Sequence, residues 1–239
     1  MPRPAPRVPP ATTATRPLRF FGVLVMPATY FLFIHKVNCY GEAMRTGRPR
    51  SVSDEAIFEA VTAVVTEVGP SGLTLAAMAD RVGLSAPALT QRFGSKRSLL
   101  LAHAEAAATG IEDPFNRARS NSPTALSALR AALLELTAGI DSRDAIANHL
   151  ALLHLDLTDP ELGAHAAKQS RLLRRAITQL LNEAISDGEI SPTDATELAD
   201  TVYTVYNGAL VTWAIDGTGS LTRWLSKRLD RVLAYHQPA

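Results

Sequence analysis

The sequence predicts an all-α protein, with a small helix-turn-helix unit on its N-terminal side and a larger helical portion behind it. From Ser53 onward, apolar residues recur at the three- and four-residue spacing of amphipathic helices, and we find no run of alternating β-branched residues bounded by hairpin turns. A glycine interrupts the helical pattern at Gly83, and a serine able to cap a new helix follows at Ser85. Hydrophobic residues make up 46% of the chain and charged residues 20%, so a core can be buried.

Residues 1–43 differ from the rest of the chain. Residues 1–19 are rich in Pro, Arg, Ala and Thr, a composition that buries too little to fold alone. The apolar stretch 20–34 resembles a signal peptide, but Pro27 interrupts it, no small-x-small cleavage site follows, and a membrane span needs about 20 residues. We expect translation to begin at Met44 and the preceding residues to be disordered or loosely attached. A secreted or membrane-anchored protein is the alternative if 20–34 is functional.

Charge is unevenly distributed along the chain. The net formal charge is +4 over residues 1–43, +2 over 44–103 and −5 over 104–239. A basic front and an acidic back suit a protein whose front meets a polyanion. Cys39 is the only cysteine, so no disulfide can form within the chain, which fits a reducing compartment such as the cytoplasm.

The first two helices have clear start signals. Ser53 is the expected N-cap of the first helix, and acidic residues follow in its first turn, where they suit the helix dipole. Gly69, Pro70 and Gly72 are expected to end this helix. The second helix is predicted to start after Thr74 and to run to about Val82.

A tight corner separates the second helix from the third, which is predicted over residues 86–93. Gly83 supplies the positive φ that a sharp turn needs without a Cβ clash. Ser85 caps the third helix, and Pro87 falls in its first turn, where no helical hydrogen bond is lost. Two such helices form a helix-turn-helix, whose short second helix fits the major groove. Its outward residues are predicted to be Ala86, Pro87, Ala88, Thr90, Gln91 and Arg92.

The remaining chain reads as further helices. A fourth helix starts near Ser95 and continues to Gly110. Five more helical segments are predicted after it, over residues 121–140, 142–157, 160–188, 191–217 and 220–236. In the segment 191–217, Ser191 is the expected N-cap and Pro192 the first helical residue.

The stretch from Arg50 to Ala102 resembles the N-terminal DNA-binding domain of TetR-family transcriptional regulators. The resemblance is carried by "GRPR", "GPSGLTLAAMADRVGLS" and "ALTQRFGSKRSLL", and by the distinctive Phe-Gly-Ser-Lys link at residues 93–96. It implies a DNA-binding domain over 44–98, followed by a helical effector-binding and dimerisation domain over 99–239. Thr90 stands where the family usually has a tyrosine, so the operator preferences of better-known members do not transfer.

Several polar residues are predicted to contact DNA. Arg48 and Arg50 precede the first helix, either as a basic arm that meets phosphates or the minor groove or as a solvated tail. Lys96 lies at a helix N-terminus, where its charge and the free N–H groups form an anion site. Gln91 and Arg92 are the best readers of base edges or phosphates, although either could simply be an exposed polar residue. The complete predicted set is Arg48, Arg50, Thr74, Ser85, Ala86, Pro87, Thr90, Gln91, Arg92 and Lys96.

The C-terminal portion is expected to dimerise and to bind a small molecule. A single recognition helix buries too little for specificity, so a two-fold homodimer reading two half-sites is expected. The predicted dimer face, on the last two helices, comprises Leu210, Trp213, Ala214, Leu221, Trp224, Leu225 and Val232. The alternative is that about half of these residues are ordinary core. Polar residues within apolar stretches predict a ligand pocket, although a histidine is more often an ordinary core or surface residue. The predicted pocket residues are His103, Asn148, His149, Tyr203, Tyr206 and Asn207.

These observations predict a cytoplasmic, ligand-responsive DNA-binding regulator, specifically a dimeric repressor on a palindromic operator that a small molecule releases. The alternative is a small-molecule-sequestering helical protein with weak or lost DNA binding. An enzyme is not expected, because GxSxG, P-loop and GxGxxG motifs are missing. No His, Cys and acid spacing suits a metal, so neither a metal nor a cofactor is expected. The expected partners are duplex DNA, a second copy of the chain and an effector, with no membrane.

Overall fold

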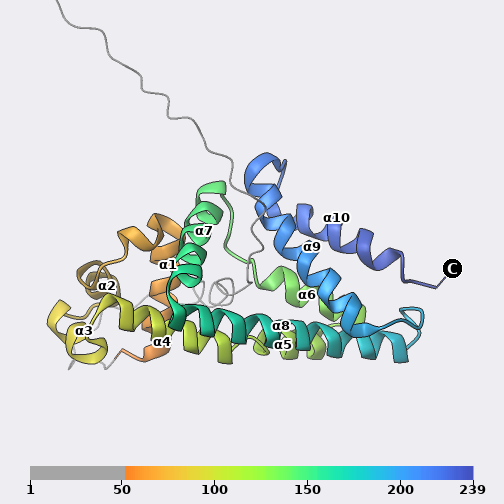
Figure 1. Ribbon diagram of the computed structural model, residues 1–239, viewed down its shortest axis with the longest axis horizontal. Coiled ribbons are helices and arrows are strands. Elements are labelled where there is room, and N and C mark those ends of the chain that lie inside the picture. The colour runs from red at the N-terminus through yellow and green to blue at the C-terminus, as the bar shows by residue number, and fades with distance from the viewer. Residues whose placement is uncertain (1–51, 239) are drawn as a thin grey trace, which may run out of the picture.

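The computed structural model describes residues 52–238, and over this range the chain is all-helical with no strand (Figure 1). The all-α prediction is therefore confirmed. No helix in the described range is long and apolar enough to cross a membrane. In chain order the helices are α1 (Asp54–Gly72), α2 (Leu75–Val82), α3 (Ala86–Phe93), α4 (Lys96–Thr109), α5 (Asp113–Asn121), α6 (Ala125–Glu135), α7 (Arg143–Thr158), α8 (Pro160–Ser186), α9 (Ala195–Asp216) and α10 (Leu221–Ala234).

The helices form two groups joined by α7 and α8. Helices α1 to α4 gather at one end of the molecule, while α9 and α10 lie toward the other, and α8 runs between them (Figure 1). Two hydrophobic cores match this arrangement. The N-terminal core is built from α1 to α4 but also takes in Leu152 of α7 and Leu162 of α8. The division at residue 98 stays a prediction, and the first core reaches well beyond that point.

Local capping signals placed the first four helices correctly. Ser53 accepts a hydrogen bond from the Ala56 amide at 3.2 Å, and Thr74, Ser85 and Ser95 accept equivalent bonds three residues ahead. Each bond satisfies a helix N–H that would otherwise lack a partner. The predicted starts of these four helices are confirmed because each start is encoded within three residues.

The end of α1 falls where the three predicted breakers stand. Gly69 has non-helical backbone angles with a φ of 73°, and one further turn continues through Pro70 to Gly72, where the helix ends. A Cβ at Gly69 would lie 2.8 Å from the Asn148 side-chain oxygen of α7. The kink therefore needs glycine twice over, for its positive φ and for the close approach of α7.

Two further helices depart from the predicted pattern. Helix α5 was not predicted, because its sequence is mostly polar around Pro114 and Phe115. The predicted start of α9 at Ser191 is wrong. Asp194 is the N-cap instead, since its carboxylate accepts from the amides of both Thr196 and Glu197 at 2.8 and 3.2 Å.

The predicted dimer face is largely internal. Leu210, Trp213, Leu221 and Leu225 are all buried in the C-terminal core of the same chain, so these four are the ordinary core residues that the alternative interpretation allowed for. The apolar stripes of α9 and α10 face the chain's own core, which a short helix needs for stability. The other three residues of the set, Ala214, Trp224 and Val232, are only partly buried.

Candidate functional site

The α2–α3 corner is a compact helix-turn-helix. Gly83 has a φ of 69°, and its amide donates to the Ala79 carbonyl, so it ends α2 in the left-handed conformation. A Cβ at Gly83 would meet nothing within 4 Å, so the backbone angle alone calls for glycine here. Met78 and Leu89 are completely buried across the corner, which fixes how α3 projects.

The outer side of α3 is exposed, as a helix that enters a DNA groove requires. Pro87, Thr90, Gln91 and Arg92 are exposed, while Ala86 is half-buried. The Thr90 hydroxyl donates to the Ala86 carbonyl at 3.0 Å, which holds it against the helix and leaves its oxygen able to accept. Gln91 is therefore the longest polar side chain on this face without a protein partner among the described residues.

Arg92 and Lys96 both have partners within the chain. The Arg92 guanidinium donates to the Val52 carbonyl at 2.6 Å and pairs with Asp54 at 2.6 Å. The Lys96 ammonium donates to the Pro70 carbonyl at 2.5 Å, which ties the start of α4 to the end of α1. Both side chains thus position the helix-turn-helix on α1. Thr74 and Ser85 are exposed N-caps, whereas Arg48 and Arg50 lie outside the described residues.

His103 and His149 lie in the joint between α1, α4 and α7. His103 Nε2 is 2.9 Å from the Thr62 hydroxyl, and His149 Nε2 is 3.1 Å from the Thr66 hydroxyl. Each threonine donates its one hydroxyl hydrogen to a carbonyl four residues earlier, so each hydroxyl accepts from the histidine. The Nε2–H tautomer follows for both rings.

Burial keeps both histidines neutral. It lowers the pKa of His103 to about 4, with a further contribution from His149, and lowers the pKa of His149 to about 4. Asn148 lies in the same joint and donates to the Thr66 carbonyl at 3.0 Å. These three residues hold α7 and α4 against α1, and the structure does not bring them together with the other predicted pocket residues.

A pocket of about 340 Å³ lies between α7, α8 and α9. Of the six predicted pocket residues, only Tyr203 lines it. Tyr206 and Asn207 are buried nearby on α9, and within the described part of the chain the Tyr206 hydroxyl and the Asn207 side-chain oxygen have no hydrogen-bond partner. We call this space the corner pocket; it is lined by Asp156, Leu157, Gly163, Ala166, Ala167, Ser170, Arg174 and Tyr203.

Polar contacts shape one wall of the corner pocket. The Ser170 hydroxyl donates to the Tyr203 hydroxyl at 2.9 Å. The Arg174 guanidinium lies 5.3 Å from the centre of the Tyr203 ring and pairs with Asp200 at 3.3 Å. Asp156 was missed by the sequence analysis, because an aspartate in the last turn of a helix has no local mark of burial, yet it is only 3% exposed.

A second pocket, of about 410 Å³, lies along α10 and is strongly cationic. The Arg228 guanidinium stacks 3.2 Å from the centre of the Trp224 ring, and burial together with the charge of Arg231 lowers the pKa of Arg228. This pocket flanks Trp224, which is only partly buried.

Comparison with known proteins identifies the helix-turn-helix. The family model described as bacterial regulatory proteins, tetR family, matches residues 57–103, which span most of α1 to the middle of α4. Residues 57–103 therefore form a DNA-binding domain of the TetR family. The match indicates a DNA-binding regulator of transcription, and the alternative of a sequestering protein is not favoured. Family membership also indicates a regulator, not an enzyme.

Solved structures show the same fold over most of the chain. A TetR transcription regulator from Haloarcula marismortui ATCC 43049 is 18% identical with a TM-score of 0.62, covering 77% of this chain and 98% of its own. The ketosteroid transcriptional regulator KstR2 of Mycobacterium tuberculosis is 14% identical with a TM-score of 0.54, covering 82% and 100%. The fatty acid degradation regulator FadR from Bacillus halodurans is 15% identical with a TM-score of 0.55, covering 74% and 96%. A comparison with curated protein sequences finds no match.

Proposed function

We propose that this TetR-family chain is a dimeric cytoplasmic repressor that binds a palindromic operator through α3 and leaves it when a small molecule binds. The observation that carries the proposal is the exposed polar side of α3, held rigidly by the buried α2–α3 corner. A side chain can discriminate bases only when its helix is fixed relative to the groove.

The DNA contacts divide into two kinds. Gln91 and Thr90 are the proposed base-edge contacts, because an amide or hydroxyl can pair with bases in the major groove. The proposed phosphate contacts lie around them on the caps and cationic side chains, where free amides and positive charge favour an anion. These contacts are Arg48, Arg50, Thr74, Ser85, Arg92 and Lys96. Ala86 and Pro87, in the first turn of α3, complete the proposed DNA-facing set.

A second copy is proposed to pack on α9 and α10. Ile215 is 70% exposed on α9, and Ala214, Trp224 and Val232 are incompletely covered. Exposed apolar residues clustered on adjacent helices are typical of an association surface. The dimer would hold two copies of α3 about 34 Å apart, one turn of DNA.

The effector is proposed to act by moving α4. Lys96 opens this helix and is bonded to α1, so a shift of α4 changes the separation of the two recognition helices. The effector must bind more tightly to the arrangement that does not bind DNA. To change the ratio of the two arrangements from 1:99 to 99:1, its binding free energies to them must differ by about 5.5 kcal/mol.

The test is fluorescence anisotropy with the DNA upstream of the chain's own gene, supported by genome-wide mapping of bound sites. Gln91→Ala and Lys96→Ala should bind the operator more weakly. Lys96→Ala should also reduce by about one the slope of the logarithm of the binding constant against the logarithm of salt concentration. Gln179→Ala and Lys168→Ala, both at exposed positions of α8, are the matched controls. A wild-type chain that binds no genomic site, or equal binding by the α3 and control variants, would overturn the proposal.

A further inference from the structure

A row of positive charges runs along the exposed side of α10. Arg223, Lys227 and Arg231 follow one another at intervals of four residues, so they lie on one face of the helix and span about 12 Å along it. All three residues are exposed. The α10 pocket, as we call the space of about 410 Å³ beside this row, is lined by Thr218, Arg223, Trp224, Lys227, Arg228 and Arg231.

The four cations of the α10 pocket form no ion pair with the described part of the chain. Asp230, the only acid between residues 223 and 231, pairs with Arg130 of α6 at 2.7 Å instead. Burial, and after it the charge of Arg231, lowers the pKa of Arg228, while the charge of Asp216 acts in the opposite direction. Like charges that gather without counter-charges disfavour one another, so this cluster favours the binding of an anion.

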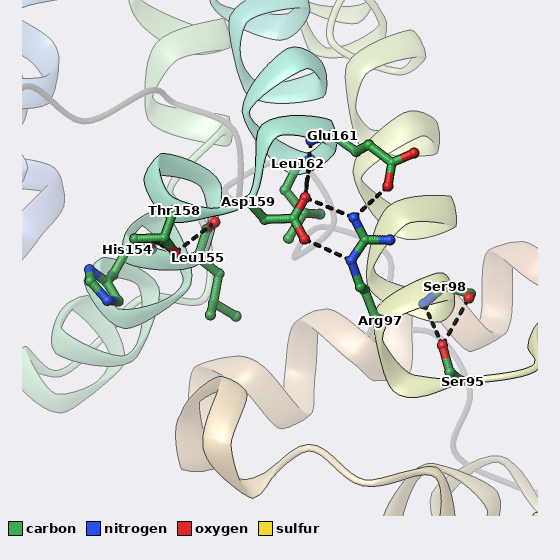
Figure 2. Close-up of polar contacts among 9 residues, drawn as sticks. All are labelled: Ser95, Arg97, Ser98, His154, Leu155, Thr158, Asp159, Glu161 and Leu162. Atoms are coloured by element: carbon green, nitrogen blue, oxygen red, sulfur yellow. Dashed lines mark hydrogen bonds and ion pairs between the residues drawn. The ribbon is translucent and has the colours of Figure 1, made fainter.

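The pairing that the α10 row lacks is present at the start of α4. Figure 2 shows the Arg97 guanidinium donating to both carboxylate oxygens of Asp159, at 2.7 and 2.9 Å, and also to Glu161. Asp159 is also the N-cap of α8 and accepts from the Glu161 and Leu162 amides, and its pKa is lowered, chiefly by Arg97. Carboxylates of the same chain thus occupy the donors of Arg97, whereas the donors along the α10 row are open to an anion from solution.

Arg228 and Trp224 add a flat surface to the α10 pocket. The Arg228 guanidinium lies 3.2 Å from the centre of the Trp224 ring and donates to the Trp224 carbonyl at 3.2 Å. The Trp224 indole N–H donates to the Ala209 carbonyl of α9 at 3.0 Å, which holds the ring in place. Flat aromatic groups stack on guanidinium planes and on indole rings. The pocket therefore combines a row of anion-binding donors with a surface for stacking.

We propose that the α10 pocket binds a small polyphosphate that carries a flat aromatic group, as nucleotides do. The phosphates lie along Arg223, Lys227 and Arg231, because guanidinium and ammonium donors suit phosphate oxygens. A row about 12 Å long also suits a chain of phosphates better than a single anion. The aromatic group stacks at Arg228 and Trp224, and the volume of about 410 Å³ lies in the range of small-molecule pockets.

The position of the α10 pocket decides between this ligand and two other occupants. Helix α10 lies at the opposite end of the molecule from α3, so an operator held by α3 does not cover the row (Figure 1). Trp224 borders the surface proposed for a second copy, but a two-fold axis at the row would bring like charges together. A small polyanion is therefore favoured over both, and the inference stands without the proposed function.

The binding test compares three probes, with EDTA present so that no metal ion shields the phosphates. Adenosine triphosphate, tripolyphosphate and adenosine are titrated into the full-length chain by isothermal calorimetry. Adenosine triphosphate should bind at least about fivefold more tightly than tripolyphosphate, because stacking adds to the attraction of the charges. Adenosine carries no phosphate and should not bind, and added salt should weaken the binding of both charged probes.

Substitutions test which residues carry the binding. The double variant Lys227→Gln and Arg231→Gln removes two exposed charges of the row and should weaken adenosine triphosphate binding by about tenfold. The matched control is Arg171→Gln with Arg175→Gln, two exposed cations four residues apart on α8 that line neither of the two pockets, and it should bind like the wild-type chain. Arg228→Gln should remove most of the preference for adenosine triphosphate over tripolyphosphate.

Circular dichroism and sedimentation of each variant separate these effects from changes in folding or association. A wild-type chain that does not bind adenosine triphosphate, or does not prefer it to tripolyphosphate, would refute the proposal, as would an equal loss of affinity in the α8 control. A double variant of the row that loses its dimer but keeps its affinity for the probe would also refute it, because the row would then serve the contact between copies.

Discussion

Mild acid should loosen the joint between the DNA-binding helices and α7. His103 and His149 are buried there as neutral rings bonded to threonines of α1. Protonation would place two positive charges in this buried joint. The unfolded chain, by contrast, accepts these protons freely.

The size of the effect follows from the two pKa values. The pKa of each histidine is 6.5 in the unfolded chain and about 4 in the native chain. Because the native pKa is depressed, the unfolded state binds more protons between these limits, and stability falls as the pH decreases through this window. One pKa unit corresponds to about 1.4 kcal/mol, so each histidine should lower the free energy of unfolding by about 2 kcal/mol at pH 5. Above pH 6.5 its contribution should be fully present.

Urea unfolding at pH 7 and pH 5, followed by circular dichroism at one fixed protein concentration, measures this loss. His103→Gln and His149→Gln keep an amide near the Nε2 position but do not titrate. Each variant should lose about 2 kcal/mol less than the wild-type chain between the two pH values. If both variants show the wild-type pH dependence, the loss comes from other groups and the assignment of neutral buried histidines is wrong.

Three further outcomes test the other parts of the structure. Arg97→Gln should weaken operator binding several-fold in anisotropy with little change in the thermal midpoint, because the exposed pair with Asp159 orients α4 more than it stabilises the fold. Gly163→Ala should destabilise the chain by about 1–3 kcal/mol in urea, because its Cβ would press on the Asp156 backbone. Ser85→Ala should lower the free energy of unfolding by about 1 kcal/mol in the same assay, because the N-cap bond of α3 is lost. Unchanged stability in Gly163→Ala and Ser85→Ala would contradict these two assignments.

The parts of the fold that were predictable from the sequence are those with signals three or four residues apart. Ser53, Thr74, Ser85 and Ser95 each cap a helix within their own turn, so the helix-turn-helix could be derived residue by residue. The start of α9 was misplaced because Ser191, Pro192 and Asp194 all resemble start signals. Only the packed chain shows that the Ser191 amide is already used by the His236 carbonyl at 2.7 Å.

The candidate site was less predictable because its contacts span long sequence separations. His103 meets Thr62 across 41 residues, and Arg97 meets Asp159 across 62. No local spacing reports such pairs. Polar residues in apolar stretches were correctly marked as unusual, but the pattern could not distinguish a helix joint from a ligand pocket.

The shared core of α1 and α7 has a consequence for engineering. Leu152 and Leu162 complete the core under the helix-turn-helix, and the bond between Thr66 and His149 fastens α1 to α7. A chimaera that joins α1 to α4 of this chain, cut near residue 98, to the effector-binding domain of another regulator would expose apolar core side chains to water. A functional graft would need to carry the matching side of the α7–α8 hairpin, so new specificities are better sought by point changes on α3 than by exchanging modules.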